Sequence, residues 1–189
     1  METVGNSVGL NVKVVITDGS QPVGNGIGPT LEAMDILKVL KNEERAPIDL
    51  KERVVLLAGE LLELSGKVAS GAGRQTALQL LESGKAYEKF LAICKAQGRF
   101  TRPVLAPYKT EIRAETSGIL KRIDNRKIAK LAKLSGAPQS KSAGILLNVH
   151  LNDSVEKDQL LYTLYAESQG ELHYALEYKN NHNDIITII

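Results

Sequence analysis

The residues best suited to chemistry lie in one short segment, where a β-forming run is followed by closely spaced glycines. Residues 12–17 read Val-Lys-Val-Val-Ile-Thr, which favours a strand, and residues 18–28 contain four glycines and a proline. A helix is expected to begin at Pro29, because proline suits the first helical turn, and Glu32 would then place a carboxylate near the positive end of the helix dipole. This order of strand, loop and helix would bring free backbone N–H and C=O groups to one place.

Two general phosphate-binding patterns do not fit this loop. A dinucleotide fingerprint needs G-x-G-x-x-G directly after the strand and an acidic residue at the end of a second strand, whereas the glycines here are at positions 24, 26 and 28. A P-loop needs a Gly-Lys-Ser/Thr ending, which is missing. From residue chemistry alone, a structural connection between strand and helix is the favoured interpretation.

The complete string of residues 17–37, TDGSQPVGNGIGPTLEAMDIL, resembles a known family. It is similar to the T-D-x-x-Q-P-x-G-x-x-x-G-x-x-L-E segment of the thymidine and pyrimidine-nucleoside phosphorylases, with the motif positions at matching offsets. The Gly-Ser before Gln-Pro and the Gly-Ile-Gly-Pro after it look most like the subgroup that contains AMP phosphorylases and thymidine phosphorylase-like relatives. Residues 117–168 more weakly resemble the C-terminal domain of the same family.

The resemblance implies an α/β (α+β) fold in two parts. Residues 1–102 are expected to be the C-terminal part of the phosphorylase α/β domain. Residues 103–189 are expected to be a small β-rich domain of the hammerhead or barrel-sandwich type, and the boundary is placed in the proline-containing stretch 98–107. No lysine occurs in a Met-Lys-Met or Asp-Lys hairpin context, so attachment of a swinging-arm cofactor is not expected. The resemblance also implies that the chain is a C-terminal segment of the family protein.

Family members catalyse phosphorolysis of a nucleoside, in which phosphate displaces the base from C1′ and gives a sugar 1-phosphate. That chemistry needs a phosphate loop with a lysine and an Arg, Ser and Lys set around the pyrimidine, and in the family these motifs precede the segment that resembles this chain. We therefore expect no catalytic and no substrate-binding residue here. The three histidines, His150, His173 and His182, have neither a recognisable acid and nucleophile nor metal-site spacing beside them.

One binding site of the family can be carried over onto this chain. Some pyrimidine-nucleoside phosphorylases bind a monovalent cation with two loop carbonyls and an acidic side chain, and the matching positions are Val23, Gly26 and Asp35. Such hard oxygen ligands suit K⁺ or another alkali or alkaline-earth ion. Asp35 stands where the family has the longer Glu, so the other interpretation is that Asp35 is a solvated acid on the helix.

Composition excludes several other classes of function. Twenty-four basic and 22 acidic residues give a formal net charge of +2 without a concentrated basic stripe, so neither nucleic acid nor a membrane surface is an expected partner. The only cysteine, Cys94, is expected to be a core residue, and the chain lacks a signal-peptide pattern and a membrane-spanning run, which favours the cytoplasm.

The function expected from these observations is a thymidine phosphorylase segment that is inactive alone. Its substrates in the full-length enzyme would be a pyrimidine nucleoside and phosphate, with no cofactor required. The full-length enzyme would be a homodimer, and this segment would be monomeric. The alternatives are an AMP phosphorylase, whose discriminating residues would lie upstream, and an interaction module without catalysis.

Local patterns predict the remaining elements. The end of a helix is expected before Gly9, and a buried helix with a capping box of Asp49 and Glu52 is expected to end at residues 65–66. Two further helices are expected around 74–82 and 85–97. Short strands are expected around 109–114, 118–123, 144–151, 160–166 and 184–189, with a helix at 125–134 and either a strand or a helix at 171–178.

Overall fold

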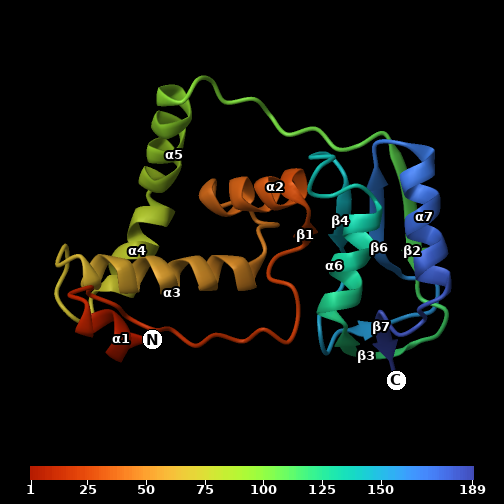
Figure 1. The fold of residues 1–189 in the computed structure, drawn as a ribbon, viewed down its shortest axis with the longest axis horizontal. Helices are drawn as coiled ribbons and strands as arrows, with labels where there is room; N and C mark the ends of the chain where they lie inside the picture. The colour runs from red at the N-terminus through yellow and green to blue at the C-terminus, as the bar shows by residue number, and fades with distance from the viewer. The chain divides into compact units, whose positions relative to one another are not determined.

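The computed structural model describes residues 1–189 and contains seven helices and seven short strands, an α+β combination (Figure 1). The chain forms two compact units, one of residues 1–18 and 37–101, the other of residues 19–36 and 102–189. The break at 101–102 adjoins the expected boundary. The compact units nevertheless differ from the expected contiguous division into residues 1–102 and 103–189. Residues 19–36 belong to the same compact unit as the C-terminal part of the chain.

The first unit is entirely helical. It comprises α1 (Glu2–Ser7), the last turn of α2 (Pro29–Leu40), α3 (Ile48–Leu64), α4 (Gly73–Glu82) and α5 (Lys85–Ala96). Its small core consists of Val39, Val55, Ala77 and Leu81. Helices α3 and α4 approach closely at Gly59, which has no side chain. A Cβ there would lie only 2.7 Å from the backbone nitrogen of Arg74.

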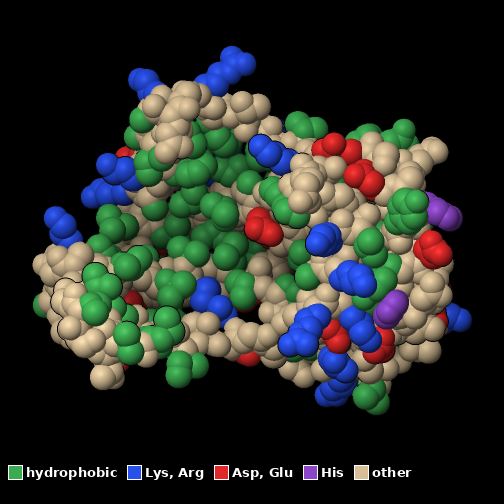
Figure 2. Space-filling view, viewed as in Figure 1, with side chains coloured by type: hydrophobic (Ala, Val, Ile, Leu, Met, Phe, Trp, Pro, Cys, Tyr) green, Lys and Arg blue, Asp and Glu red, His purple; other side chains and the backbone are tan.

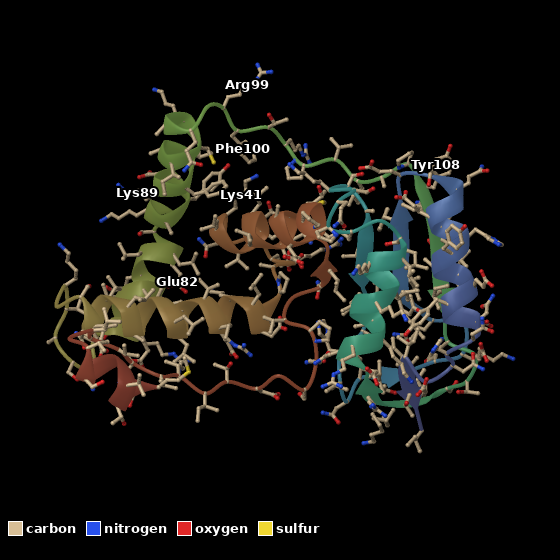
Figure 3. All side chains as sticks on the ribbon, in the orientation of Figure 1. Lys41, Glu82, Lys89, Arg99, Phe100 and Tyr108 are labelled. Carbon is tan, nitrogen blue, oxygen red and sulfur yellow. The ribbon has the colours of Figure 1, made fainter.

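Aromatic contacts tie α5 to its neighbours in this unit. The Lys41 ammonium group lies 5.6 Å from the ring centroid of Tyr87, and Phe90 meets Phe100 edge-to-face at 6.0 Å; Figure 3 labels Lys41 and Phe100. Such contacts add modestly to the burial of apolar surface. Ala86 of α5 also packs against the core of the unit, but no residue of α5 is fully buried.

The helix ends of this unit follow the predicted signals. After α1, Leu10 N–H donates to the Gly5 carbonyl at 3.0 Å while Gly9 has a φ of 77°, which is the pattern of a Schellman C-cap. The end of α3 repeats this pattern with Gly66, whose φ is 68°. The predicted helix ends at Gly9 and at residues 65–66 are therefore confirmed.

The strand expected over residues 12–17 is not formed. This segment is extended but pairs with no strand, and its Val14 N–H donates instead to the Glu2 carboxylate at 2.7 Å. The Ile16 side chain is 94% exposed. The prediction was wrong for this chain because a β-strand requires a neighbouring strand to pair its backbone groups, and the first unit contains none.

Three further expectations for the helical unit were wrong. Helix α3 was expected to be largely buried, but it buries only Val55 and Gly59, and Leu61 is 63% exposed; apolar side chains are visible over the helical unit in Figure 2. Its N-terminus has no side-chain cap, since Pro47 occupies the N-cap position. Cys94 is half-buried rather than a core residue, because α5 has too few neighbours to cover it.

The second unit contains two antiparallel sheets. The larger has the strand order β1-β4-β6-β2, formed by Gly26–Ile27, Gly144–Leu147, Leu160–Ala166 and Tyr108–Arg113. The smaller has the order β5-β3-β7, formed by Ser154–Val155, Gly118–Ile123 and Ile186–Ile188. The expected strands are present, but β4 ends at Leu147 rather than at residue 151.

Helices α6 (Asn125–Leu134) and α7 (Gln169–Asn180) contact each other and pack on the larger sheet, α6 against β4 and α7 against β6 and β2. The stretch 171–178, which could have been strand or helix, is therefore helical. The core between helices and sheets is much larger than that of the first unit and includes Leu120, Leu131, Ile145 and Leu164, all fully buried. None of the seven helices combines the length and the apolar character that crossing a membrane would require.

Candidate functional site

The glycine loop lies in the second unit, where it adds the edge strand β1 to the larger sheet. Strand β1 pairs antiparallel with β4, with Gly26 opposite Leu146. On either side of this short pairing, Leu147 N–H donates to the Asn25 carbonyl at 2.7 Å and Thr30 N–H donates to the Lys141 carbonyl at 3.0 Å. The loop is thus fastened to the C-terminal part of the chain by backbone hydrogen bonds.

Close packing explains two of the glycines. A Cβ on Gly26 would lie 2.5 Å from the carbonyl carbon of Leu31, at the start of α2. A Cβ on Gly28 would lie 2.5 Å from the Ala143 carbonyl oxygen, and the φ of Gly28 is 130°, which L side chains rarely adopt. These glycines allow the loop, α2 and β4 to meet.

Three polar residues of this segment hold the loop in place. The Gln21 side-chain oxygen accepts from Leu151 N–H at 2.8 Å, and the Glu32 carboxylate accepts from Gly28 N–H at 3.0 Å. Oδ2 of Asp35 accepts from two successive backbone N–H groups, those of residues 25 and 26, both at 2.7 Å. The expectation of free backbone N–H groups was therefore wrong for these amides, since each already has an acceptor within the protein.

Asp35 is a buried residue. Its exposed fraction is 2%, so the interpretation as a solvated helix acid was wrong. Beside it, Oδ1 of Asn25 is buried and has no hydrogen-bond partner. An unpartnered oxygen next to a buried carboxylate fits the donor set of a cation. No group of three or more His, Cys, Asp or Glu side chains gathers in the chain, so one carboxylate and neutral oxygens, including the predicted carbonyls of Val23 and Gly26, would have to suffice.

The three histidines have surroundings that differ from those of the loop carboxylates. Nε2 of His150 is buried without a partner, and His173 is exposed on α7. His182 stacks on the ring of Tyr178 with centroids 4.0 Å apart, and its Nδ1 lies 2.8 Å from the Tyr178 carbonyl oxygen. Of the three, only His182 makes a ring contact and a hydrogen bond within the second unit.

Three carboxylates have lowered pKa values because nearby groups donate hydrogen bonds to them. Asp124 caps α6, and its pKa is lowered by the hydrogen bond from Lys127 N–H and by the nearby Arg122. The pKa of Asp184 is lowered mainly by its hydrogen bond with the Lys127 side chain. In the first unit, Gly71 and Gly73 N–H groups lower the pKa of Glu63. These shifts have structural causes and do not indicate a catalytic group.

Known proteins match both the C-terminal part and the whole chain. Residues 119–185 match the family described as "Pyrimidine nucleoside phosphorylase C-terminal domain". Proteins named "Putative thymidine phosphorylase" are 52% identical in Legionella pneumophila (strain Paris) and 48% identical in Hahella chejuensis, each over 188 residues and 100% of this chain. The protein of that name from Maricaulis maris is 50% identical over 185 residues, or 98% of this chain.

Residues 119–185 form a pyrimidine nucleoside phosphorylase C-terminal domain, in agreement with the α+β fold. The chain as a whole belongs to the thymidine and pyrimidine-nucleoside phosphorylase family. It spans just over a third of the length of these relatives, 36% of the Legionella protein and 37% of the Hahella protein.

Proposed function

We propose that the chain serves as the C-terminal segment of a thymidine phosphorylase. In that reaction phosphate attacks C1′ of thymidine, the glycosidic bond breaks, and thymine and 2-deoxyribose 1-phosphate result. The names of relatives about half identical over the whole chain support this proposal. The chemistry is the positioning of phosphate against a developing oxocarbenium-like centre together with protonation of the departing base.

The contribution of this segment is to hold the glycine loop. The observation that carries this role is that the side chains of Gln21, Glu32 and Asp35 accept hydrogen bonds from backbone N–H groups of the loop and of the following part of the unit. A scaffold that immobilises a loop lowers the cost of ordering it when substrates bind. The phosphate-binding and base-binding side chains would come from elsewhere in a complete enzyme, so the isolated chain would be inactive.

A chimera tests the proposal. The chain replaces the aligned segment of the Legionella pneumophila relative, and thymine release from thymidine is followed with and without phosphate, with AMP offered in parallel. We expect phosphate-dependent thymine release by the chimera and none by the isolated chain. Release of adenine from AMP would report the substrate preference of the upstream part, which the relative supplies, and would not bear on the role of this segment. A folded but inactive chimera beside an active parent relative would contradict the role of this segment.

We also propose that the loop binds a monovalent cation through the carbonyls of Val23 and Gly26 and the carboxylate of Asp35. The unpartnered Oδ1 of Asn25 supports this proposal, since it would be an additional oxygen ligand. One carboxylate among neutral oxygens provides little negative charge, which suits an alkali ion better than a divalent one. When bound, the ion would neutralise the buried carboxylate and stiffen the loop.

Thermal unfolding of the chain in KCl and in choline chloride at equal ionic strength tests this cation site. We expect a higher melting temperature in KCl, and we expect the difference between the two salts to vanish in Asn25→Leu and Asp35→Asn. The Glu44→Gln variant, at an exposed acid of the other unit, should retain the difference. Equal melting temperatures of the unaltered chain in both salts would reject the site.

A further inference from the structure

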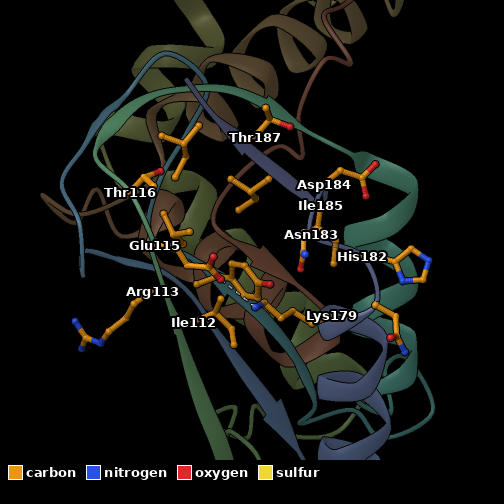
Figure 4. A pocket seen from close by; sticks show the side chains of 15 residues that line it. Ile112, Arg113, Glu115, Thr116, Lys179, His182, Asn183, Asp184, Ile185 and Thr187 are labelled. Atoms are coloured by element: carbon orange, nitrogen blue, oxygen red, sulfur yellow. Dashed lines mark ion pairs between the residues drawn. The ribbon is translucent and has the colours of Figure 1, made fainter.

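The second unit contains a cavity that the phosphorylase role does not use. Its volume is about 590 Å³, and its walls come from β2 and the turn after it, β6, the C-terminal end of α7 and the segment leading into β7 (Figure 4). This volume lies within the range of cavities that bind small molecules. All of the lining residues belong to the second unit, so the cavity is a property of that unit alone.

Part of the wall is apolar. Ile112, Leu161, Ile185, Ile186 and Ile188 line the cavity and also belong to, or pack against, the main core of the unit. Side chains that are anchored in a core hold their positions, so the wall is preformed. Such a surface favours the apolar body of a ligand, because burying that body removes it from water.

The wall also contains a tyrosine hydroxyl. Tyr162 lines the cavity, and as a whole residue it is only 2% exposed. Desolvation raises the pKa of Tyr162, so the group keeps its proton at neutral pH and can donate it in a hydrogen bond. An acceptor atom on a ligand in the cavity would accept a hydrogen bond from this hydroxyl.

A cation lies on the same wall. The Lys179 side chain, 23% exposed, forms an ion pair with Glu115 at 3.7 Å, which Figure 4 marks with a dashed line. The Glu115 side chain is 85% exposed, so the pair is weak and a ligand anion could replace that carboxylate. Arg113, also in the wall, is already engaged with the Glu111 carboxylate at 2.5 Å and the Asp158 carbonyl at 2.9 Å. Of these two cations, Lys179 is the less exposed, at 23% against 51% for the Arg113 side chain, so we assign it to the ligand.

We propose that this cavity binds a small amphipathic anion, with its apolar body against the isoleucines, an acceptor atom on the Tyr162 hydroxyl and its carboxylate or phosphate on Lys179. This site is independent of the phosphorolysis proposed above. It would let a metabolite of that chemistry stabilise the C-terminal unit.

The experiment uses the whole 189-residue chain and titrates three kinds of probe while ¹H–¹⁵N amide spectra are recorded. Phenylacetate and phenyl phosphate carry both an apolar body and an anion, benzyl alcohol carries the body alone, and acetate and inorganic phosphate carry the anion alone. We expect saturable shifts of the amides of residues 181–188 with the first pair only. The stronger binder of that pair identifies the anion as carboxylate or phosphate.

Variants locate the binding. Tyr162→Phe and Lys179→Met should each weaken binding of the better probe at least tenfold, whereas Lys121→Met, at an exposed lysine of β3 outside the cavity, should not. If Tyr162→Phe fails to fold, Lys179→Met with the spectral mapping decides alone. Absence of saturable shifts at millimolar probe, equal binding of benzyl alcohol, or unchanged binding by Lys179→Met would each overturn the proposal.

Discussion

At the scale of single residues, polar side chains of the segment that carries the family resemblance hold the loop in place through hydrogen bonds to backbone N–H groups. Asp35 shows this most clearly, because one carboxylate oxygen accepts from two successive loop amides while the side chain is almost completely buried. A charge can remain buried only when hydrogen bonds or counter-charges compensate it. The family spacing therefore reflects how the loop is held as much as what the loop binds.

Replacing Asp35 by alanine should destabilise the chain strongly. Two buried N–H groups lose their acceptor, and each buried donor left unsatisfied costs roughly 1–3 kcal/mol, so we expect a loss of about 3 kcal/mol in the free energy of unfolding. Urea denaturation followed by circular dichroism measures it. Glu44→Ala, at an exposed acid, should change stability by less than about 0.5 kcal/mol. Equal losses for the two variants would contradict the fastening role.

Tyr162 should make the second unit sensitive to alkali. Its pKa is raised by burial, so the folded state holds the proton more tightly than the unfolded state. The stability that this contributes is complete below the ordinary tyrosine pKa of about 10 and is lost as pH rises above it. We expect the urea midpoint to fall less between pH 9 and pH 11 in Tyr162→Phe than in the unaltered chain. Tyr174→Phe, at a tyrosine that is 64% exposed, serves as control and should behave like the unaltered chain.

At the scale of elements, side-chain caps distinguish the helices of the two units. Helix α6 is capped by Asp124, and α7 begins with a reciprocal capping box between Ser168 and Glu171. Helices α3, α4 and α5 have no side-chain cap. The helices with the better-defined N-termini are those that pack on the larger sheet.

The capping box of α7 can be tested alone. Ser168→Ala removes the acceptor for Glu171 N–H and should lower the free energy of unfolding by about 1 kcal/mol. Thermal unfolding followed by tyrosine circular dichroism reports the second unit, because five of the six tyrosines lie in it. Ser168→Thr should retain most of the stability, since threonine also caps helices. A threonine variant as unstable as the alanine variant would indicate packing rather than capping.

At the scale of the whole molecule, the second unit is assembled from two separated parts of the chain. Residues 19–36 contribute the edge strand β1 and the buried Leu31 to a unit formed otherwise by residues 102–189. Without them, β4 would become an edge strand with unpaired backbone groups.

This dependence predicts the behaviour of a fragment. Residues 102–189 alone should melt at a lower temperature than the second unit does in the whole chain, and a synthetic peptide of residues 19–36 should raise that melting temperature. A peptide of the same residues with Gly28→Val should have no effect, because a side chain there would collide with the Ala143 carbonyl. A fragment as stable as the whole chain would show that the loop adds nothing to this unit.

Local patterns were sufficient to predict most elements. Strands β3 and β6 and helix α6 have the predicted bounds, and the helix ends at Gly9 and Gly66 follow from glycine's access to positive φ. Three of the wrong predictions share one cause. Each depends on whether a neighbouring element pairs with a segment or covers it, and a local pattern carries no information on which neighbour is present. These three are the β-forming run at residues 12–17, the apolar surface of α3 and the half-buried Cys94.

The sequence alone determined the family, through the spacing of the Gln-Pro glycine motif, and most secondary structure, because turn residues, caps and hydrophobic periodicity act over a few neighbouring positions. Only the tertiary structure decided what the motif's polar residues do, that residues 19–36 join the C-terminal unit, and that Tyr162 and Lys179 line one cavity. These features depend on contacts between positions more than a hundred residues apart or on different strands and helices. Such contacts follow from packing and backbone pairing of the folded chain, which local sequence patterns do not encode.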